Sequence, residues 1–472
     1  MSQAELKELQ QALMDAVDYN QWLHTASKID QLTGAYQWRA EIEEGDNIYT
    51  LLRAHITTIK HYQASDAWQA LIEFIPESLH RTIAELNNVR LYQVALSGPK
   101  FVIDEYFTVV ESALNLFCET NVLGLSQTEK LKMFQAAERN FGRPALMLSG
   151  GGTFGIYHFG VIKALLEQEL LPEVISGTSM GSIAAGVVAK NTDQELKEIL
   201  ASPYSTHHTP LKTQSFREVL SSLSLLDPNQ LLECVQANMG DTTFQEAFEK
   251  TGREVSITVS SSRSSQKPRV LNHLTAPNVL MSYASKASCS VPGLFPACVL
   301  KAKKADDQIV DYMSDERWFD GSFASDIPRQ RISRLHNVNY FIVSQANPHI
   351  LPFVSQRQKH GKKAVIKDLV VSSVLGQGRS LLKVAKRRLY RQPWQSWLDH
   401  ASILLEQDYL GDINIHPDFS LDWYMKFMKN PTHKELDELI MIGERATWPS
   451  IQMINNQTRI SKTLRRCIKL LS

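Results

Sequence analysis

The sequence predicts an α/β protein with a largely parallel sheet, flanked by N-terminal and C-terminal helical regions. Apolar residues recur at helical spacing through residues 1–140, and short β-branched runs alternate with helix-length segments through residues 144–347. Helical spacing returns in residues 348–472. Strands that alternate with helices form parallel sheets. We therefore expect a helical N-terminal domain, an α/β core and a helical, basic C-terminal region with these boundaries.

The elements of the core follow one another in a regular order. ALMLS is an apolar run of strand length, and a glycine cluster and the helix-like FGIYHFGVIKALLEQ follow it. VIS then predicts a second strand, and MGSIAAGVVAK a second helix. EVSITVS, RVLNHL and NVNYFIVSQ are later β-branched runs bounded by turn residues, which is typical of strands.

Composition excludes several classes of protein. The chain has 472 residues, 43% of them hydrophobic, and a formal net charge of zero, which argues against a dedicated nucleic-acid binder. The start MSQAELKELQ lacks the pattern of a secretory signal, and no uninterrupted apolar run of about 18 residues occurs. The five cysteines are scattered, without a Cys-x-x-Cys pair. We expect neither a disulfide framework nor a metal site, and we expect a reducing, cytoplasmic setting.

The strongest motif is a G-x-S-x-G sequence formed by Gly177, Ser179 and Gly181. It lies between the strand EVIS and the helix MGSIAAGVVAK. A sharp strand-to-helix turn of this kind lifts a serine hydroxyl clear of the sheet, and the flanking glycines tolerate the strained backbone. The alternative is a serine that only caps the helix. The context of strand, turn and helix favours a nucleophile.

A glycine cluster, SGGGTFG, precedes this motif at residues 149–155. Its N–H groups are free to converge on an anion, as acyl transfer requires. The same letters fit the dinucleotide fingerprint G-x-G-x-x-G. That alternative needs an acidic residue at the end of the next strand, but Glu173 precedes that strand. The nucleotide interpretation therefore fails.

A serine nucleophile needs a base, and Asp320 is the candidate. It follows the apolar pair Trp318-Phe319 and precedes Gly321. An isolated Asp-Gly pair is usually only a turn. This pair is interpreted as catalytic only because the other two motifs accompany it. Candidate histidines after the G-x-S-x-G motif include His273, His336 and His349, but none has a distinctive setting, and each is interpreted as structural.

Together, these three motifs resemble the patatin-like lipases, which use a Ser–Asp dyad without histidine. Longer segments, including TTFQEAFEKTGREVSITV and LLEQDYLGDINIHP, resemble the subgroup of triacylglycerol lipases that mobilise stored fat in fungi and plants. That subgroup carries a helical domain of unknown function ahead of the patatin core, which matches residues 1 to about 140. Its members are much longer, which suggests that this chain is a bacterial relative.

The resemblance implies a three-layer, patatin-like core that cleaves fatty-acyl esters of glycerolipids through an acyl-enzyme. It places the nucleophile at Ser179, the base at Asp320 and the oxyanion amides at Gly150, Gly151 and Gly152. It implies no metal or organic cofactor. It also implies a cytoplasmic enzyme attached peripherally to a membrane or a lipid droplet.

Two positions depart from the broader family. Plant storage patatins and related phospholipases begin the glycine loop with Asp and carry Arg or Lys before its last glycine, whereas this chain has Ser149 and Phe154. A cation that could meet a phosphate head group is therefore missing, which favours neutral glycerides over phospholipids.

Three alternatives stay open at the level of the residues. One is a phospholipase A or lysophospholipase. Another is a lysophospholipid acyltransferase, because His61 and Asp66 fit the His-x-x-x-x-Asp spacing found in the subgroup. The third is a non-catalytic protein that binds lipid surfaces. The residues indicate no oligomeric state.

A basic stretch near the C-terminus is the candidate membrane contact. Between Arg357 and Arg391 we count eleven Lys or Arg and a single acid, Asp368. Apolar residues alternate there with Lys383, Lys386, Arg387 and Arg388. Basic amphipathic helices lie in lipid interfaces, but a solvated helix face has the same pattern. A shorter basic run from Arg459 to Lys469 repeats the theme.

Overall fold

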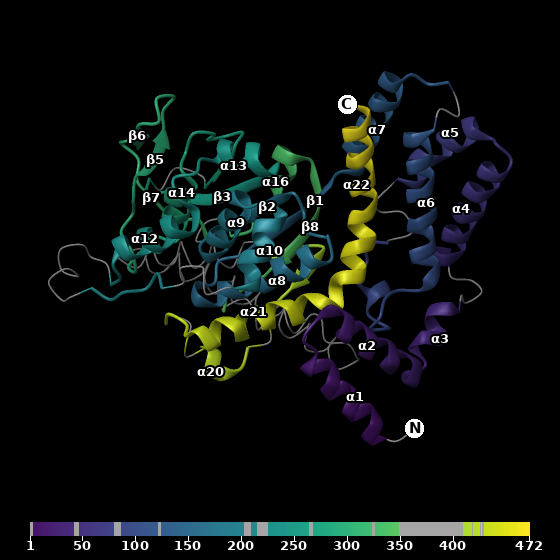
Figure 1. The fold of residues 1–472 in the computed structure, drawn as a ribbon, viewed down its shortest axis with the longest axis horizontal. Helices are drawn as coiled ribbons and strands as arrows, with labels where there is room; N and C mark the ends of the chain where they lie inside the picture. The colour runs from purple at the N-terminus through teal and green to yellow at the C-terminus, as the bar shows by residue number, and fades with distance from the viewer. Residues whose placement is uncertain are drawn as a thin grey trace, which may run out of the picture.

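The computed structural model describes residues 3–41, 47–79, 86–120, 124–202, 209–214, 225–263, 268–322, 326–348, 409–417, 419–424, 426 and 429–472. Figure 1 shows an α/β core at one end of the molecule and N-terminal helices at the other. The long helix α22 (Ile451–Leu471) lies between them. The predicted fold class is therefore confirmed.

The N-terminal region is helical because its apolar residues form buried stripes. In α6 (Phe101–Glu119) the buried residues Ile103, Phe107, Val110, Leu114 and Phe117 recur three or four positions apart, which places them on one face. The other helices are α1 (Gln3–Asp15), α2 (Tyr19–Thr33), α3 (Ala35–Ala40), α4 (Asn47–Ala64), α5 (Trp68–Ser78), η2 (Val89–Tyr92) and α7 (Gln127–Phe141).

The core sheet has the order β4-β3-β2-β1-β8-β9, and β7 also pairs with β3. Its strands are β1 (Arg143–Leu148), β2 (Val174–Gly177), β3 (Glu254–Ser261), β4 (Arg269–Leu271), β7 (Trp318–Asp320), β8 (Val338–Ser344) and β9 (Ile413–Ile415). The pairs among β3, β2, β1, β8 and β9 are parallel, whereas β4 and β7 are antiparallel to β3. Strands β5 (Leu300–Lys303) and β6 (Ile309–Tyr312) form a separate antiparallel pair.

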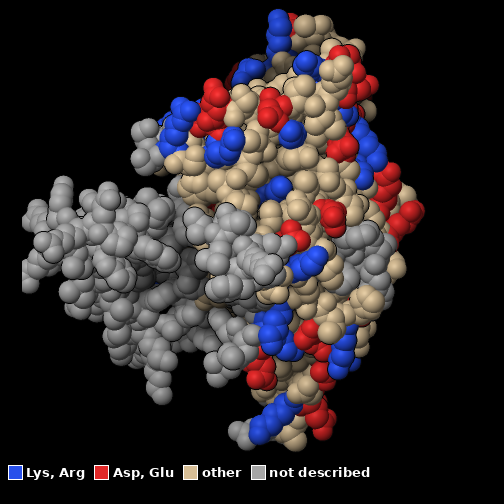
Figure 2. Space-filling model, turned by 90° about the vertical axis from the view of Figure 1, so that its left-hand side faces the viewer, with Lys and Arg blue, Asp and Glu red and all other residues tan. Residues whose placement is uncertain are grey.

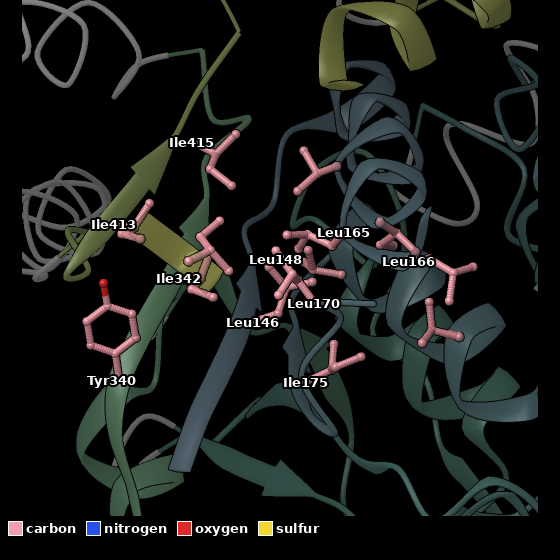
Figure 3. Close-up of a cluster of buried hydrophobic side chains, with 14 of the residues drawn as sticks. Leu146, Leu148, Leu165, Leu166, Leu170, Ile175, Tyr340, Ile342, Ile413 and Ile415 are labelled. Atoms are coloured by element: carbon pink, nitrogen blue, oxygen red, sulfur yellow. The ribbon is translucent and has the colours of Figure 1, made fainter. Parts of the chain in front are cut away.

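Both faces of this sheet are buried, which makes the core three layers deep. Leu146 and Leu148 of β1 belong to one hydrophobic cluster, together with Leu165 of α8 (Tyr157–Glu167). Met147, between them, belongs to a second cluster that contains Ile332 of α16 (Arg329–His336). Alternate residues of a strand point to opposite faces. Figure 3 shows part of the first cluster, where Leu146 and Leu148 lie close to Leu165 of α8.

The remaining helices of the core connect these strands. They are η3 (Gly152–Ile156), α9 (Met180–Lys190), α10 (Asp193–Ala201), α12 (Pro228–Met239), α13 (Phe244–Thr251) and α14 (Met281–Ser288). Capping boxes begin α10 at Thr192 and α13 at Thr243, and each satisfies two N–H groups at the start of its helix.

The C-terminal region adds to the core in a way that helical spacing does not predict. Strand β9 extends the sheet beside β8, an element that the expectation of a helical region did not include. Its helices are α20 (Leu421–Tyr424), α21 (His433–Thr447), η5 (Trp448–Ser450) and α22. Helix α21 packs along α8, and α22 packs against α6 and α7. The C-terminal region therefore joins the core to the N-terminal helices.

Candidate active site

The residues singled out in the sequence lie at the carboxyl ends of the parallel strands. The glycine loop follows β1, and Ser179 follows β2. Strand β1 lies between β2 and β8, with β3 beyond β2 and β9 beyond β8. The order of strands therefore reverses direction at β1. In open α/β sheets, ligands bind at the carboxyl edge at such a switch point.

Ser179 occupies a strained turn between β2 and α9. Its φ is 52° and its ψ is −127°, a conformation that non-glycine residues avoid. A Cβ on Gly177 would lie 2.2 Å from the Gly181 carbonyl oxygen, and one on Gly181 would lie 2.3 Å from the Leu148 carbonyl oxygen. Both glycines of the motif are therefore required by the close approach of the backbone.

The turn is anchored to the next strand through Ser288. The Ser179 N–H donates a hydrogen bond of 2.8 Å to the Ser288 hydroxyl, which itself donates to the Thr258 carbonyl oxygen at 2.7 Å. Ser179 remains 8% exposed. Ser288 was not anticipated from the sequence, because 109 positions separate it from Ser179.

Asp320 ends β7, and the pairing of this strand with β3 places it beside Ser179. Its Oδ1 atom accepts a hydrogen bond of 2.7 Å from the Ser322 N–H. Its Oδ2 atom is buried and has no hydrogen-bond partner among the described residues. A Cβ on Gly321 would lie 2.4 Å from the Thr258 carbonyl oxygen, so glycine is needed for this close approach. The structure thus brings Ser179 and Asp320 together.

Burial changes the acidity of this carboxyl group. Asp320 is fully buried, and desolvation is the main cause that raises its pKa to about 6, against the opposing hydrogen bond from Ser322 and the nearby Ser179 side chain. Both groups stabilise the ionised form. At neutral pH the group is therefore ionised, but it binds a proton more readily than an exposed aspartate does.

The N–H groups of the glycine loop have different partners. The Gly150 N–H donates a hydrogen bond of 2.8 Å to Asp326 Oδ1. The N–H groups of Gly151 and Gly152 have no partner among the described residues. A Cβ on Gly150 would lie 3.3 Å from the Ser179 Cβ, so the loop lies against the turn. The structure brings Gly150 to Ser179, but the amide of this glycine, expected to be free, is bound to a carboxyl group.

Buried polar side chains that the sequence analysis did not single out support this loop. His158 is fully buried, and its ring nitrogens contact the Ser344 hydroxyl at 2.7 Å and the Ser149 carbonyl oxygen at 3.0 Å. Burial lowers the pKa of His158 to about 3, so the ring is neutral at physiological pH. These contacts join residues on separate elements, and local sequence patterns carry no signal for them.

Phe154, the position where related phospholipases carry a cation, lies in an aromatic cluster. It is fully buried, and its ring centroid lies 4.2 Å from that of Phe419. Phe419 also contacts Trp423 of α20, with ring centroids 6.1 Å apart. An apolar wall therefore stands next to the glycine loop.

Two of the histidines considered as alternative bases, His273 and His336, occupy structural positions. His336 is buried and bonds to Glu254 through Nδ1, and Glu254 also binds Arg143 at 2.6 Å. Glu254 and Arg143 begin β3 and β1, at the edge of the sheet opposite to Ser179. His273 stacks on Phe248 with ring centroids 4.0 Å apart. His349 lies outside the described residues.

The acyltransferase-like pair lies in the N-terminal helical region. His61 is on α4 and Asp66 follows the end of this helix, and both are exposed. Figure 1 shows α4 at the end of the molecule opposite to the core. The pair therefore lies apart from Ser179.

The basic segments differ in what the structure shows of them. Lys383, Lys386, Arg387 and Arg388 lie outside the described residues. In the shorter run on α22, Arg459 pairs with Glu111 at 2.6 Å and Arg466 with Glu119 at 3.1 Å, both on α6. This run therefore attaches α22 to the N-terminal helices. On the face shown in Figure 2, acidic and basic side chains of the described residues are interspersed.

Two features of the described residues concern metals and membranes. Within these ranges, no group of His, Cys, Asp and Glu is arranged to hold a metal ion. None of the described helices has the length and apolarity to cross a membrane.

Comparison with known proteins identifies the family. Residues 146–331 match the family described as patatin-like phospholipase, and residues 1–139 match a domain of unknown function, DUF3336. Triacylglycerol lipase ptl3 of Schizosaccharomyces pombe is 34% identical over 464 residues, which cover 94% of each chain. The chain therefore belongs to the patatin-like phospholipase family, and it is a carboxylic ester hydrolase of the lipase type.

Two further relatives are longer proteins. Triacylglycerol lipase 5 of Saccharomyces cerevisiae is 30% identical, and the match covers 93% of this chain and 62% of that protein. Triacylglycerol lipase SDP1L of Arabidopsis thaliana is 31% identical, with 97% of this chain and 58% of that protein covered. The fission yeast relative is matched almost end to end, so the expectation that fungal members are much longer is wrong for this relative.

Proposed function

We propose that the chain hydrolyses fatty-acyl esters of glycerolipids, with triacylglycerol as the substrate class, through a dyad of Ser179 and Asp320. One observation carries the proposal. The buried Asp320 carboxyl, whose Oδ2 lacks a partner among the described residues, lies beside Ser179 on its strained turn. A hydroxyl nucleophile needs a neighbouring base, and an elevated pKa brings a carboxylate closer to the working pH of a general base.

In the acylation step, the Ser179 Oγ attacks the ester carbonyl carbon, and Asp320 takes the hydroxyl proton. The carbonyl oxygen becomes an oxyanion, which the free N–H groups of Gly151 and Gly152 stabilise; one such donor contributes about 3 kcal/mol. Asp320 then gives the proton to the glycerol oxygen as the C–O bond breaks. The products are an acyl-enzyme and a glycerolipid with one more free hydroxyl.

Water completes the cycle in the deacylation step. Asp320 takes a proton from the water molecule, and the water oxygen attacks the acyl carbon. The oxyanion forms again at the same amides and then collapses. The Ser179 Oγ leaves with the proton held by Asp320, and a free fatty acid is released. Neither step requires a metal or an organic cofactor.

Two observations support a neutral glyceride over a phospholipid. Four relatives at 30–34% identity are named triacylglycerol lipases. Phe154 is buried against Phe419 where related phospholipases place a cation, so this loop position has no cation to meet a phosphate head group. We further propose that the enzyme docks peripherally on a membrane or lipid droplet through the basic segment between Arg357 and Arg391.

A panel of lipid substrates tests the proposal. Fatty-acid release is measured from a trioleoylglycerol emulsion, dioleoylphosphatidylcholine vesicles and lysophosphatidylcholine, with the wild type and with Ser179→Ala. We expect the fastest release from trioleoylglycerol and none with Ser179→Ala. Faster release from either phospholipid favours the phospholipase alternative. A lack of release from every lipid favours a lipid-binding protein.

A further inference from the structure

The carboxyl group of Asp326 lies at the centre of a buried hydrogen-bond network around the glycine loop. Its Oδ1 atom accepts the Gly150 N–H at 2.8 Å, and its Oδ2 atom contacts the Asn347 side-chain amide at 2.5 Å. The Asp326 backbone carbonyl oxygen accepts the Thr178 hydroxyl at 2.8 Å. Asp326 is only 1% exposed. Its contacts therefore join three segments: the loop after β1, the turn after β2 and the segment after β8.

The amide that Asp326 binds lies next to an amide of the expected oxyanion site. Gly150 is next in sequence to Gly151, whose N–H has no partner among the described residues. The loop also lies against Ser179, because a Cβ on Gly150 would be 3.3 Å from the Ser179 Cβ. The hydrogen bond from the Gly150 N–H therefore anchors the loop one residue before the Gly151 N–H and restrains where that N–H lies.

We propose that Asp326 is a positioning residue that holds the glycine loop in the geometry needed to receive the oxyanion, by accepting the Gly150 N–H. This inference rests on the proposed function, in which the amides of Gly151 and Gly152 stabilise the oxyanion. Gly150 itself then donates to Asp326 and not to the substrate. The proposal assigns a role to a residue that neither reacts with nor contacts the ester.

The protonation state of Asp326 fits a neutral hydrogen-bond acceptor and not a charged carboxylate. Desolvation, followed by repulsion from Asp320, outweighs the hydrogen bonds from Gly150 and Asn347 and raises the pKa of Asp326 to about 8. At neutral pH the group is therefore a neutral acid. Asparagine is its closest mimic, because the amide oxygen can accept the Gly150 N–H while the amide nitrogen donates to the Asn347 side-chain oxygen after that amide turns over.

Loss of this acceptor should act on the rate constant and spare substrate binding. A loop that loses its anchor misplaces donors that act mainly on the transition state, and a misplacement of about 1 Å can cost roughly 100-fold in rate. We expect Asp326→Ala to lower kcat roughly 10- to 100-fold on p-nitrophenyl butyrate while KM stays within about threefold. Asp326→Asn should restore most of kcat.

Asp30 provides a matched control for the loss of a buried aspartate. It is also 1% exposed, and it accepts the N–H groups of Leu96 and Ser97 at 2.9 and 2.7 Å in the N-terminal region. Asp30→Ala should lower Tm, as Asp326→Ala does, but leave kcat unchanged. If Asp326→Ala does not fold, Asn347→Ala replaces it, since it removes only the second contact with the carboxyl group. We then expect a smaller loss of kcat.

The outcomes separate the inference from the proposed function. An unchanged or higher kcat in Asp326→Ala, or in Asn347→Ala if it replaces that variant, overturns the inference. If Asp326→Asn is as slow as Asp326→Ala, Asp326 does not act as a neutral hydrogen-bond acceptor. If Asp30→Ala loses as much kcat as Asp326→Ala, the loss comes from general destabilisation of the protein. Ser179→Ala is measured in parallel. Retained hydrolysis in that variant overturns the proposed dyad itself.

Discussion

The Ser179 N–H donates a hydrogen bond of 2.8 Å to the Ser288 hydroxyl, and this bond ties the strained turn after β2 to the neighbouring strand β3 through Thr258. Ser288→Ala leaves a buried N–H without a partner. We expect the free energy of unfolding to fall by about 1–3 kcal/mol, and kcat to fall because Ser179 is held less firmly. Denaturant unfolding and p-nitrophenyl butyrate kinetics measure the two effects.

Ser290→Ala is the control for this prediction. Ser290 is also buried, and its hydroxyl donates to the Lys286 carbonyl oxygen at the end of the same helix. We expect its kcat to stay close to that of the wild type. If both substitutions lower kcat equally, the hydrogen bond from Ser179 to Ser288 has no specific effect on catalysis.

The pH dependence of hydrolysis should report the ionisation of Asp320. Burial raises the pKa of this carboxyl to about 6, and a general base acts in its ionised form. We therefore expect kcat/KM to fall tenfold per pH unit below about 6 on a soluble ester. An acid limb close to pH 4 would indicate a carboxyl with an ordinary pKa and would contradict the buried base.

Asp320→Asn should remove activity and increase stability at alkaline pH. The pKa of this group is raised from 3.8 to about 6, so its contribution to stability is present below pH 3.8 and is lost as pH rises through about 6. At pH 8 the wild type carries a buried charge that costs up to about 3 kcal/mol, and the amide does not. Thermal unfolding at pH 4 and pH 8 measures the difference, which should be larger at pH 8. A variant less stable than the wild type at pH 8 contradicts the account.

Structural features that depend on a short stretch of sequence could be predicted from the sequence. The strand-turn-helix setting of Ser179, the glycine loop and the order of core elements all depend on neighbouring residues. Asp326 could not be found in this way, because 176 positions separate it from Gly150. Strand β9 was missed because it has only three residues, Ile413–Ile415, too few to show a period. The Gly150 amide was expected to be free, because the sequence near Gly150 gives no sign of its distant partner, Asp326.

Docking on lipid should depend on the basic segment. Replacing Lys383, Lys386, Arg387 and Arg388 with Gln should lower hydrolysis of emulsified trioleoylglycerol and spare p-nitrophenyl butyrate. Exposed charges are screened over about 8 Å in physiological salt, so binding of the wild type to vesicles that contain anionic lipid should weaken steeply as salt rises. An equal loss on both substrates would mean that the segment serves folding.

Labelling with a fluorophosphonate probe tests the central claim most directly, because the probe forms a covalent bond only with an activated serine. The account predicts that the wild-type protein gains one probe mass, that peptide mapping places it on Ser179, and that Ser179→Ala gains none. Asp320→Asn should label much more slowly while remaining folded. A probe mass on another residue, or undiminished labelling of Ser179→Ala, would contradict the assignment of Ser179 as the nucleophile.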